Sequence, residues 1–249
     1  MKELYKELYK CFDKDKLKDC AHFVAMRGSK YIDCKTKLFI VGRAANGWSQ
    51  LAHESAEEFG RAAEAEFQEK QGFQWIDEEN KRFIAKPKDS DKSRYFLSKS
   101  PFWRTIEQIC RKMNILKSED ARFFDYIAWS NLYKISPNNE GNPDNCMCKK
   151  QLEVCRKILK REIEEYDPTH ILLITDYDRW FANEGYNFSE LFETNRIGSN
   201  YEKKSVFVEG TGTYTFGGKK IPVVISCRPE HRNETDFVEA VVKSLTDSK

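Results

Sequence analysis

The sequence predicts a three-layer α/β/α domain, in which a four-stranded, mainly parallel sheet lies between helices. Two observations support this prediction. Short apolar runs alternate with amphipathic helical patterns, and this alternation is typical of parallel strands joined by crossover helices. The apolar core of one run, residues 171–174, reads Ile-Leu-Leu-Ile. A purely aliphatic strand of this kind is buried on both faces, as the central strands of a parallel sheet are.

The 249 residues predict a single domain spanning 1–249, with an N-terminal helical extension at 1–36 and an irregular insertion at 71–99. Hydrophobic residues make up 40% of the chain and aromatic residues 13%. This composition excludes an intrinsically disordered protein, because the chain can bury enough apolar surface to offset its conformational entropy.

The apolar and amphipathic patterns place each element in order along the chain. The four strands of the sheet are expected at 37–41, 123–129, 170–175 and 221–226. Helices are expected at 2–12, 51–70, 101–114, about 143–166 and about 234–246. Smaller features complete the prediction: a pair of short strands around the turn 77–80, a turn-rich loop at 135–145, and a hairpin of 205–209 and 213–216 that turns at Gly210 and Gly212.

Helix boundaries follow from local chemistry. Ser100 is a good N-cap, and Pro101 fits the first helical position because its missing N–H has no partner there in any helix. Asp167 precedes Pro168, and a residue before proline disfavours the helical conformation. The long helix before the third strand is therefore expected to end at this point.

Charge is balanced, with 42 basic and 40 acidic residues and a net charge of +2. This excludes a protein that coats DNA through overall positive charge, but a local basic groove stays possible. Residues 86–104 are locally basic, with aromatic residues interleaved. Two interpretations are open: a solvated loop with a few packed aromatics, or a nucleic-acid surface in which Lys99 and Arg104 contact DNA phosphates.

No apolar run approaches the ~20 residues that a membrane-spanning helix needs, and the N-terminus lacks the apolar core of a signal peptide. A cytoplasmic protein without a membrane partner is the expectation. Of the eight cysteines, Cys146, Cys148 and Cys155 alone are suggestively spaced, and no CxxC pair accompanies them. We expect reduced cysteines and no iron–sulfur cluster, metal or other cofactor.

Four polar segments follow the four predicted strands, at 43–48, 130–134, 175–178 and 228–233. Because the carboxyl ends of parallel strands meet at one edge of a sheet, these segments are expected to converge there. The first is a glycine turn between a strand and a helix, which presents backbone N–H groups to a ligand. The two carboxylates at 176 and 178 are interpreted as helix-entry residues and not as a metal site.

Four motifs together resemble the uracil-DNA glycosylase superfamily, over roughly residues 36–246 apart from 71–99. They are the turn Gly42-Arg-Ala-Ala-Asn-Gly47, then Asn131 in WSNLYK, the helix pattern from Cys155 and Leu159 through Glu162-Ile163 to Pro168, and Arg228-Pro229 in SCRPEH. The resemblance implies the same fold and a DNA glycosylase, a hydrolase of N-glycosidic bonds that flips a damaged base out of DNA.

The resemblance also implies roles for single residues at the expected edge. Gly42 and Gly47 form the turn, Trp48 walls a base pocket, and Asn131 pairs with the base, since its amide is both donor and acceptor. Arg43 or Asn46 holds the attacking water, and Arg228 or His231 supports the departing base. Pro229 and Arg232 contact the DNA backbone.

Departures from the family pattern keep two further hypotheses open. Ala44 stands where the family commonly has the water-positioning Asp or Asn, no proline follows, and Arg228 stands in place of the family's histidine. The second hypothesis is a non-catalytic nucleotide- or nucleic-acid-binding protein of the same fold, and the third is an unrelated α/β enzyme acting on nucleotides or small molecules. Structural roles also stay open: Asn131 and Asn46 as turn residues, Trp48 as core, Arg228 and Arg232 as solvated or ion-paired residues, and His231 as surface.

Overall fold

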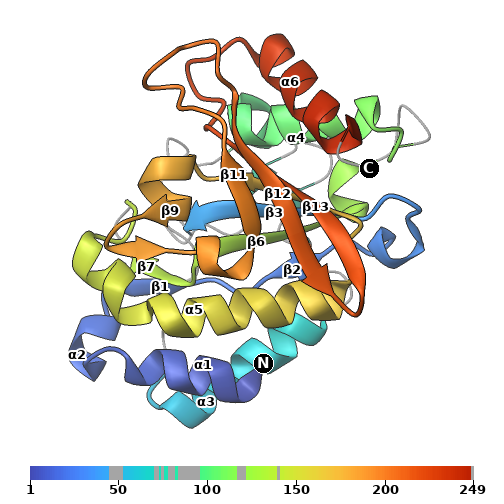
Figure 1. Ribbon diagram of the computed structural model, residues 1–249. Coiled ribbons are helices and arrows are strands. Elements are labelled where there is room, and N and C mark those ends of the chain that lie inside the picture. The colour runs from blue at the N-terminus through green and yellow to red at the C-terminus, as the bar shows by residue number, and fades with distance from the viewer. Residues whose placement is uncertain are drawn as a thin grey trace.

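The computed structural model describes residues 1–44, 53–69, 73, 76–77, 82–83, 96–116, 122–138 and 141–247. Three layers are visible in Figure 1, with a twisted sheet between α4 and α6 on one side and α1, α3 and α5 on the other. The α/β class predicted from the sequence is therefore confirmed.

The helices are α1 (Lys2–Lys10), α2 (Lys14–Leu17), α3 (Ala56–Gln68), α4 (Pro101–Lys112), α5 (Asn145–Tyr166) and α6 (Glu234–Asp247). The five predicted helices, α1 and α3 to α6, have bounds close to those expected, and the short α2 was not predicted. Pro101 occupies the first turn of α4, as expected. Asp144 caps α5 by accepting a hydrogen bond from the Met147 N–H at 2.7 Å, and Asp167 ends that helix in the left-handed conformation at φ 43°.

Short helical turns connect these elements. They are η1 (Tyr31–Asp33), η3 (Leu97–Lys99), η4 (Phe123–Asp125), η5 (Tyr177–Phe181) and η6 (Ser189–Leu191), of which η5 is a π-helical turn.

The predicted sheet of four strands is wider in the structure. The described residues form a seven-stranded sheet in the order β11-β12-β13-β8-β3-β6-β2. The strands are β2 (Met26–Arg27), β3 (Leu38–Ala44), β6 (Ile127–Tyr133), β8 (His170–Ile174), β11 (Glu193–Arg196), β12 (Val208–Phe216) and β13 (Lys219–Ser226). The four predicted strands are its parallel centre, β13-β8-β3-β6, and antiparallel strands extend both edges.

Three small pairs lie outside this sheet. Each is antiparallel: β1 (Cys20–His22) with β7 (Ile135–Pro137), β4 (Ile76–Asp77) with β5 (Arg82–Phe83), and β9 (Ala182–Asn183) with β10 (Tyr186–Asn187). Segment 1–36, expected to be helical, therefore also supplies β1 and β2. The loop expected at 135–145 begins with β7.

The predicted hairpin around Gly210 and Gly212 is wrong, because β12 runs without a turn through both glycines. A Cβ on Gly210 would lie 2.5 Å from the Tyr177 ring, and one on Gly212 would lie 2.1 Å from the Glu193 carbonyl oxygen. These glycines allow close approach of neighbouring segments. The turn lies instead at Gly217 and Gly218, whose φ angles of +55° and +76° suit a two-residue hairpin between β12 and β13.

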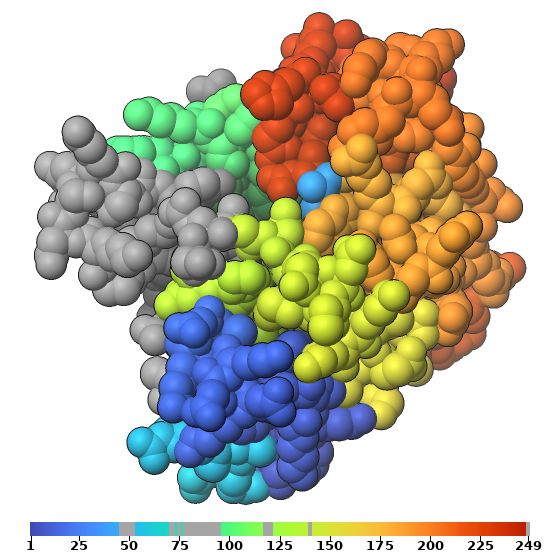
Figure 2. Space-filling view, turned by 90° about the vertical axis from the view of Figure 1, so that its left-hand side faces the viewer, coloured from blue at the N-terminus to red at the C-terminus, as the bar shows by residue number. Residues whose placement is uncertain are grey.

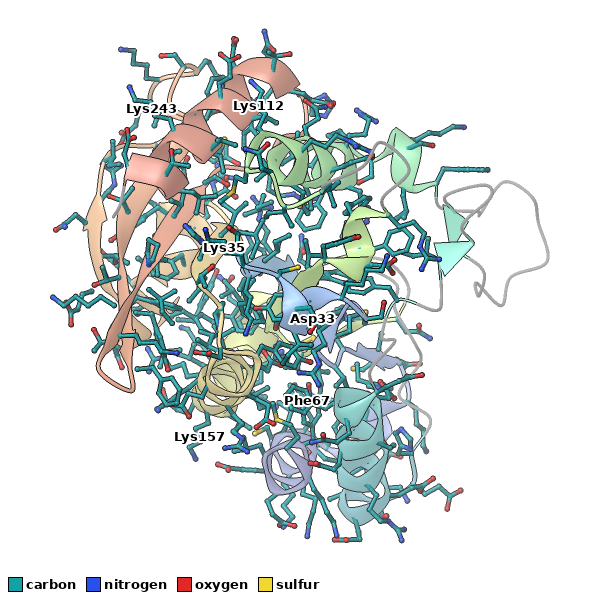
Figure 3. All side chains as sticks on the ribbon, turned by 90° about the vertical axis from the view of Figure 1, so that its right-hand side faces the viewer. Asp33, Lys35, Phe67, Lys112, Lys157 and Lys243 are labelled. Carbon is teal, nitrogen blue, oxygen red and sulfur yellow. The ribbon has the colours of Figure 1, made fainter. Side chains whose placement is uncertain are left out.

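In Figure 1 the arrow of β3 points to the left, and Figure 2 shows the molecule from that side. The light-blue end of β3 lies near the centre of this view, between red, orange-gold and yellow-green segments. The carboxyl ends of the central strands therefore open onto this face. Figure 3 shows the opposite face, where Lys112 and Lys243 mark α4 and α6, and Phe67 and Lys157 mark α3 and α5.

Each side of the sheet has its own core, because successive strand residues point to opposite faces. In β3, Leu38 and Ile40 pack against the cluster that includes α4 and α6. Phe39 and Val41 pack against the cluster that includes α1, α3 and α5. A strand covered on both faces reads as a continuous apolar run, which is why β3 was recognisable in the sequence.

The second central strand lies later than predicted. Residues 123–125 form the turn η4, and β6 extends over Ile127–Tyr133, so Ser130 and Asn131 lie inside the strand. Their polar side chains suggested a strand end, but a buried polar cluster continues the strand. Lys134, fully buried, donates from Nζ to Ser130 Oγ at 2.6 Å and to Glu162 Oε2 at 2.9 Å, and Ser130 Oγ donates to Glu162 Oε2 at 2.6 Å.

We predict that Lys134→Met destabilises the fold by about 3–5 kcal/mol, because it leaves the Glu162 carboxylate buried without a counter-charge. Urea unfolding at neutral pH measures this change. Lys157→Met is the matched control on α5, because it removes only the exposed ion pair with Glu7 and should cost about 0–1 kcal/mol.

The pH dependence of Lys134→Met follows from the pKa of Glu162. Burial already raises that pKa, while Lys134 and Ser130 lower it, so removing Lys134 raises it further. The folded state then binds a proton that the unfolded state releases, and stability declines as pH rises from the unfolded pKa to the folded one. The variant should therefore regain stability as the pH is lowered from 7 toward about 5; a loss that does not change with pH would contradict an ionised, unpaired Glu162.

Candidate functional site

The four central strands create a reversal of strand order next to β3. From β3 the chain passes to β6 on one side, and then crosses to β8 on the other side. In open α/β sheets ligands bind outside the carboxyl ends of the strands at such a reversal. The candidate site is therefore the face of Figure 2, where the end of β3 meets the ends of β6, β8 and β13.

Asn131 is the most unusual side chain at this edge. It pairs with Gly42 across the parallel strands β6 and β3 and is 2% exposed. Its amide nitrogen Nδ2 is buried and makes no hydrogen bond to any residue that the structure describes. An unpaired buried donor costs about 1–3 kcal/mol, so natural structures satisfy nearly all of them. The amide is thus placed to donate to a ligand that brings its own acceptor.

Gly42 gives the Asn131 amide its space. A Cβ at position 42 would lie 2.3 Å from Asn131 Oδ1 and 3.5 Å from its Cγ. Glycine at 42 is therefore explained by the close approach of the amide. The expected juxtaposition of Gly42 and Asn131 at one edge of the sheet is found.

Arg43 lies at the same edge, where protein groups hold its guanidinium in place. Its guanidinium pairs with the Asp176 carboxylate through Nη2, and Nε donates to the Thr175 carbonyl oxygen at 3.2 Å. The guanidinium carbon also lies 5.5 Å from the centre of the Trp180 ring. Burial, with a contribution from Arg228, lowers the pKa of Arg43 to about 10, so Arg43 stays charged at neutral pH.

Asp176 is held in this position by its backbone. Its φ of 63° is unusual for a residue other than glycine, and such conformations persist where the surroundings fix them. The Asp176 N–H donates to the Ser226 carbonyl at 3.0 Å, and the next N–H, of Tyr177, donates to Glu209 Oε2 at 2.7 Å. The side chain faces Arg43 and binds no other described group.

Thr175 adds a second unsatisfied polar atom. The residue is fully buried directly after the last residue of β8, and its Oγ1 makes no hydrogen bond within the described part of the chain. Asn131 lies within β6 and Thr175 lies directly after β8, and these two strands flank β3. Asn131 Nδ2 and Thr175 Oγ1 can each form a hydrogen bond with a polar ligand without giving up a hydrogen bond to a described residue of the protein.

The segment after β13 contains the other predicted site residues. Arg228 forms a two-pronged ion pair with Glu230, with Nε 2.9 Å from Oε2. His231 is exposed and adopts a φ of 61°. Pro229 is buried, and Arg232 donates from Nη1 to the His231 carbonyl at 3.3 Å.

The remaining predicted residues lie elsewhere or outside the described part of the chain. Arg104 forms an ion pair with Glu234 at the start of α6 and donates to the Ser98 carbonyl oxygen at 2.9 Å. These contacts connect α4 to α6 and to η3. Lys99 lies 4.8 Å from the centre of the Phe96 ring. Asn46, Gly47 and Trp48 lie outside the described residues, as does most of the predicted insertion 71–99.

The spaced cysteines are separate from this edge. Cys146 is exposed, whereas Cys148 and Cys155 are buried on α5 and donate to the Pro143 carbonyl and to Gln151 Oε1. Burial raises the pKa of both thiols to about 12, so they stay protonated at neutral pH. Among the described residues there is no group of three or more His, Cys, Asp or Glu side chains arranged to hold a metal, and no helix there could span a bilayer.

Sequence reasoning missed three contributors: Thr175, the pairing of Asp176 with Arg43, and Glu209. Glu209 is fully buried within β12, and it accepts from the N–H groups of Tyr177 and Asn200, each at 2.7 Å. An acidic residue between Val208 and Gly210 in an apolar run was the available signal. A carboxylate buried in a strand needs hydrogen-bond donors, and backbone N–H groups of other segments supply them here.

Comparisons with models of protein families and with curated proteins give no match to this chain. The fold and the geometry of the edge are therefore the grounds on which its function is inferred.

We predict that Gly42→Ala displaces the Asn131 amide and destabilises the fold by about 1–3 kcal/mol, because the new methyl group overlaps Oδ1. Chemical denaturation measures the change. Gly198→Ala is the control, since its Cβ would meet Val206 at an ordinary 3.6 Å. Equal stability of the two variants would show that the amide can move aside without cost.

Proposed function

We propose that this chain binds a nucleobase at the carboxyl edge of its sheet, as a divergent protein of the uracil-DNA glycosylase type. The observation that supports the proposal is the buried, unpaired Nδ2 of Asn131, held against Gly42 at the point where the strand order reverses. The sequence resemblance assigns base recognition to this same residue.

An asparagine amide complements the edge of a base such as uracil. Nδ2 donates to a carbonyl oxygen of the base, and Oδ1 accepts from the neighbouring ring N–H. The carbonyl oxygen of the base gives the unpaired donor a partner. Binding therefore recovers the roughly 1–3 kcal/mol that the unpaired donor costs the free protein. A base without a carbonyl at this position leaves the donor unpaired and is rejected.

The charges at the edge suit a nucleotide or nucleic acid. Arg228 is close enough to Arg43 to lower the pKa of Arg43, and the two residues lie at the carboxyl ends of β13 and β3, the strands on either side of β8. Asp176 and Glu230 each neutralise one of them in part. A phosphate near Arg228 competes with Glu230 for a guanidinium that is 37% exposed, whereas the more deeply buried Arg43 stays with Asp176.

Excision of the base is the second candidate function, and the position of Arg228 favours it. Water would add to C1′ of the sugar while the bond from C1′ to the base nitrogen breaks, the base leaves with the bonding electron pair, and the proton that the water loses ends on the departed base. A permanent cation at the end of β13 stabilises that negative charge as it develops. Arg43, fixed by Asp176 and Thr175, acts in this arrangement as part of the wall and not as the residue that holds the water.

We predict that Asn131→Ala weakens binding of uracil-containing DNA by roughly 10- to 100-fold, the equivalent of a bidentate base contact worth about 1–3 kcal/mol. Gel shifts on oligonucleotides that carry uracil, hypoxanthine or xanthine measure binding, and release of the free base on the same DNA measures excision. Asn195→Ala is the control, since Asn195 is an exposed residue on the edge strand β11.

The two assays separate the candidates. Binding without base release supports the non-catalytic protein, and binding with base release that Asn131→Ala abolishes supports the glycosylase. Unchanged binding and release in Asn131→Ala would remove this residue from the mechanism. Neither binding nor release by the native chain would leave the unrelated α/β enzyme as the remaining hypothesis.

A further inference from the structure

The turn between β11 and β12, residues 197–207, presents an aromatic side chain beside the candidate site. Tyr201 is 46% exposed and Ile197 is 59% exposed, and both are among the few large hydrophobic residues on the surface of the described chain. The turn lies next to the edge, because the Cys227 N–H at the end of β13 donates to the Phe207 carbonyl at 3.0 Å. Tyr201 is also close enough to Arg43 to influence its pKa.

The turn is rigid, so the exposed ring is held in place. Asn200 is fully buried and donates from Nδ2 to the carbonyl oxygens of Lys204 and Val206, at 2.8 and 2.9 Å. Its N–H donates to the Glu209 carboxylate at 2.7 Å, and Ser199 Oγ donates to the same carboxylate at 3.5 Å. Glu209 also accepts from Tyr177, and so one buried carboxylate fixes both the start of η5 and this turn.

Positive charge surrounds the ring. The Arg179 guanidinium carbon lies over the Tyr201 ring, 3.7 Å from its centre, and Lys204 Nζ lies farther away at 5.8 Å. Arg179 and Lys204 are exposed and form no ion pair within the described residues. Two acidic residues of this neighbourhood, Asp178 and Glu202, are both paired with Arg196. Two cations therefore stay available to a polyanion.

We propose that Arg179, Tyr201 and Lys204 form a stacking surface for single-stranded nucleic acid, which guides the strand to the base-binding edge. An unpaired base stacks on the Tyr201 ring in place of the Arg179 guanidinium, which then contacts a neighbouring phosphate, as Lys204 does. Aromatic rings flanked by cations bind single strands in this way because every base has a π face and every linkage a phosphate. The approach to the Asn131 site rests on the proposed function, whereas the stacking itself does not depend on Asn131.

The test uses two fluorescein-labelled 12-nucleotide single-stranded DNAs, one with a central uracil and one with a central abasic site, measured by fluorescence anisotropy at several salt concentrations. Tyr201→Ala should weaken binding of both by about tenfold, and Tyr201→Phe, which keeps the ring, by less than about twofold. Arg179→Ala and Lys204→Ala should each reduce the salt dependence, by close to one phosphate contact. Thermal unfolding checks that the exposed substitutions leave the fold intact.

The abasic strand separates this proposal from the function of the base site. Asn131→Ala should weaken binding of the uracil strand only, and failure of that effect alone counts against the base site and not against the surface. Equal binding of the abasic strand by Tyr201→Ala and the native chain would overturn the stacking surface, even if the two cation variants weaken binding. Tighter binding of the matching duplex than of the single strand would also overturn it, as would no binding of either strand by the native chain.

Discussion

The arrangement of the site depends on one buried ion pair, between Lys134 and Glu162. Both side chains are fully buried, one after the end of β6 and one on α5, and Ser130 Oγ lies between them. The Lys134 ammonium also donates to the Asn131 carbonyl oxygen at 2.8 Å. These bonds let a strand with polar residues run through the middle of the molecule, and they fix the backbone from which the Asn131 side chain projects.

A buried pair of this kind contributes specificity more than stability. Desolvation of the two charges offsets much of their attraction, and apolar replacements of both partners are often neutral or stabilising. What an apolar pair does not supply is a set of directed hydrogen bonds to Ser130 and Asn131. Gln151 continues the same design at the next residues, since its Oε1 accepts from the N–H groups of Lys134 and Ile135. The end of β6 is thereby defined to within one residue, which matters because a shift of one residue reverses every side chain.

The opposite flank of the site is organised around a single buried carboxylate, Glu209. The Glu209 carboxylate is fully buried and is stabilised by backbone N–H groups and a hydroxyl, without a cationic partner among the described residues. It connects β12 to η5 and to the turn at 199–200, and so it sets the position of Asp176 against Arg43. Two buried polar clusters, one on each side of β3, thus fix the backbone around the edge, while the interiors of the strands form the two cores.

The sequence by itself determined the α/β class, the four central strands and the helices around them, because these elements carry periodic apolar patterns that local chemistry produces. It also placed Asn131 and Gly42 at a common edge. It did not determine the three antiparallel strands of the sheet, nor the length of β6, nor the course of β12. In each case the deciding partner is distant in sequence. Glu162 accepts a hydrogen bond from Ser130 and so allows this polar residue inside β6. Gly210 and Gly212 leave room for Tyr177 and Glu193, and they do not form a turn. The same reason explains why only the structure identified three further residues of the site: Thr175, Asp176 and Glu209. Whether a polar side chain is buried, paired or unpaired depends on neighbours that the fold brings together.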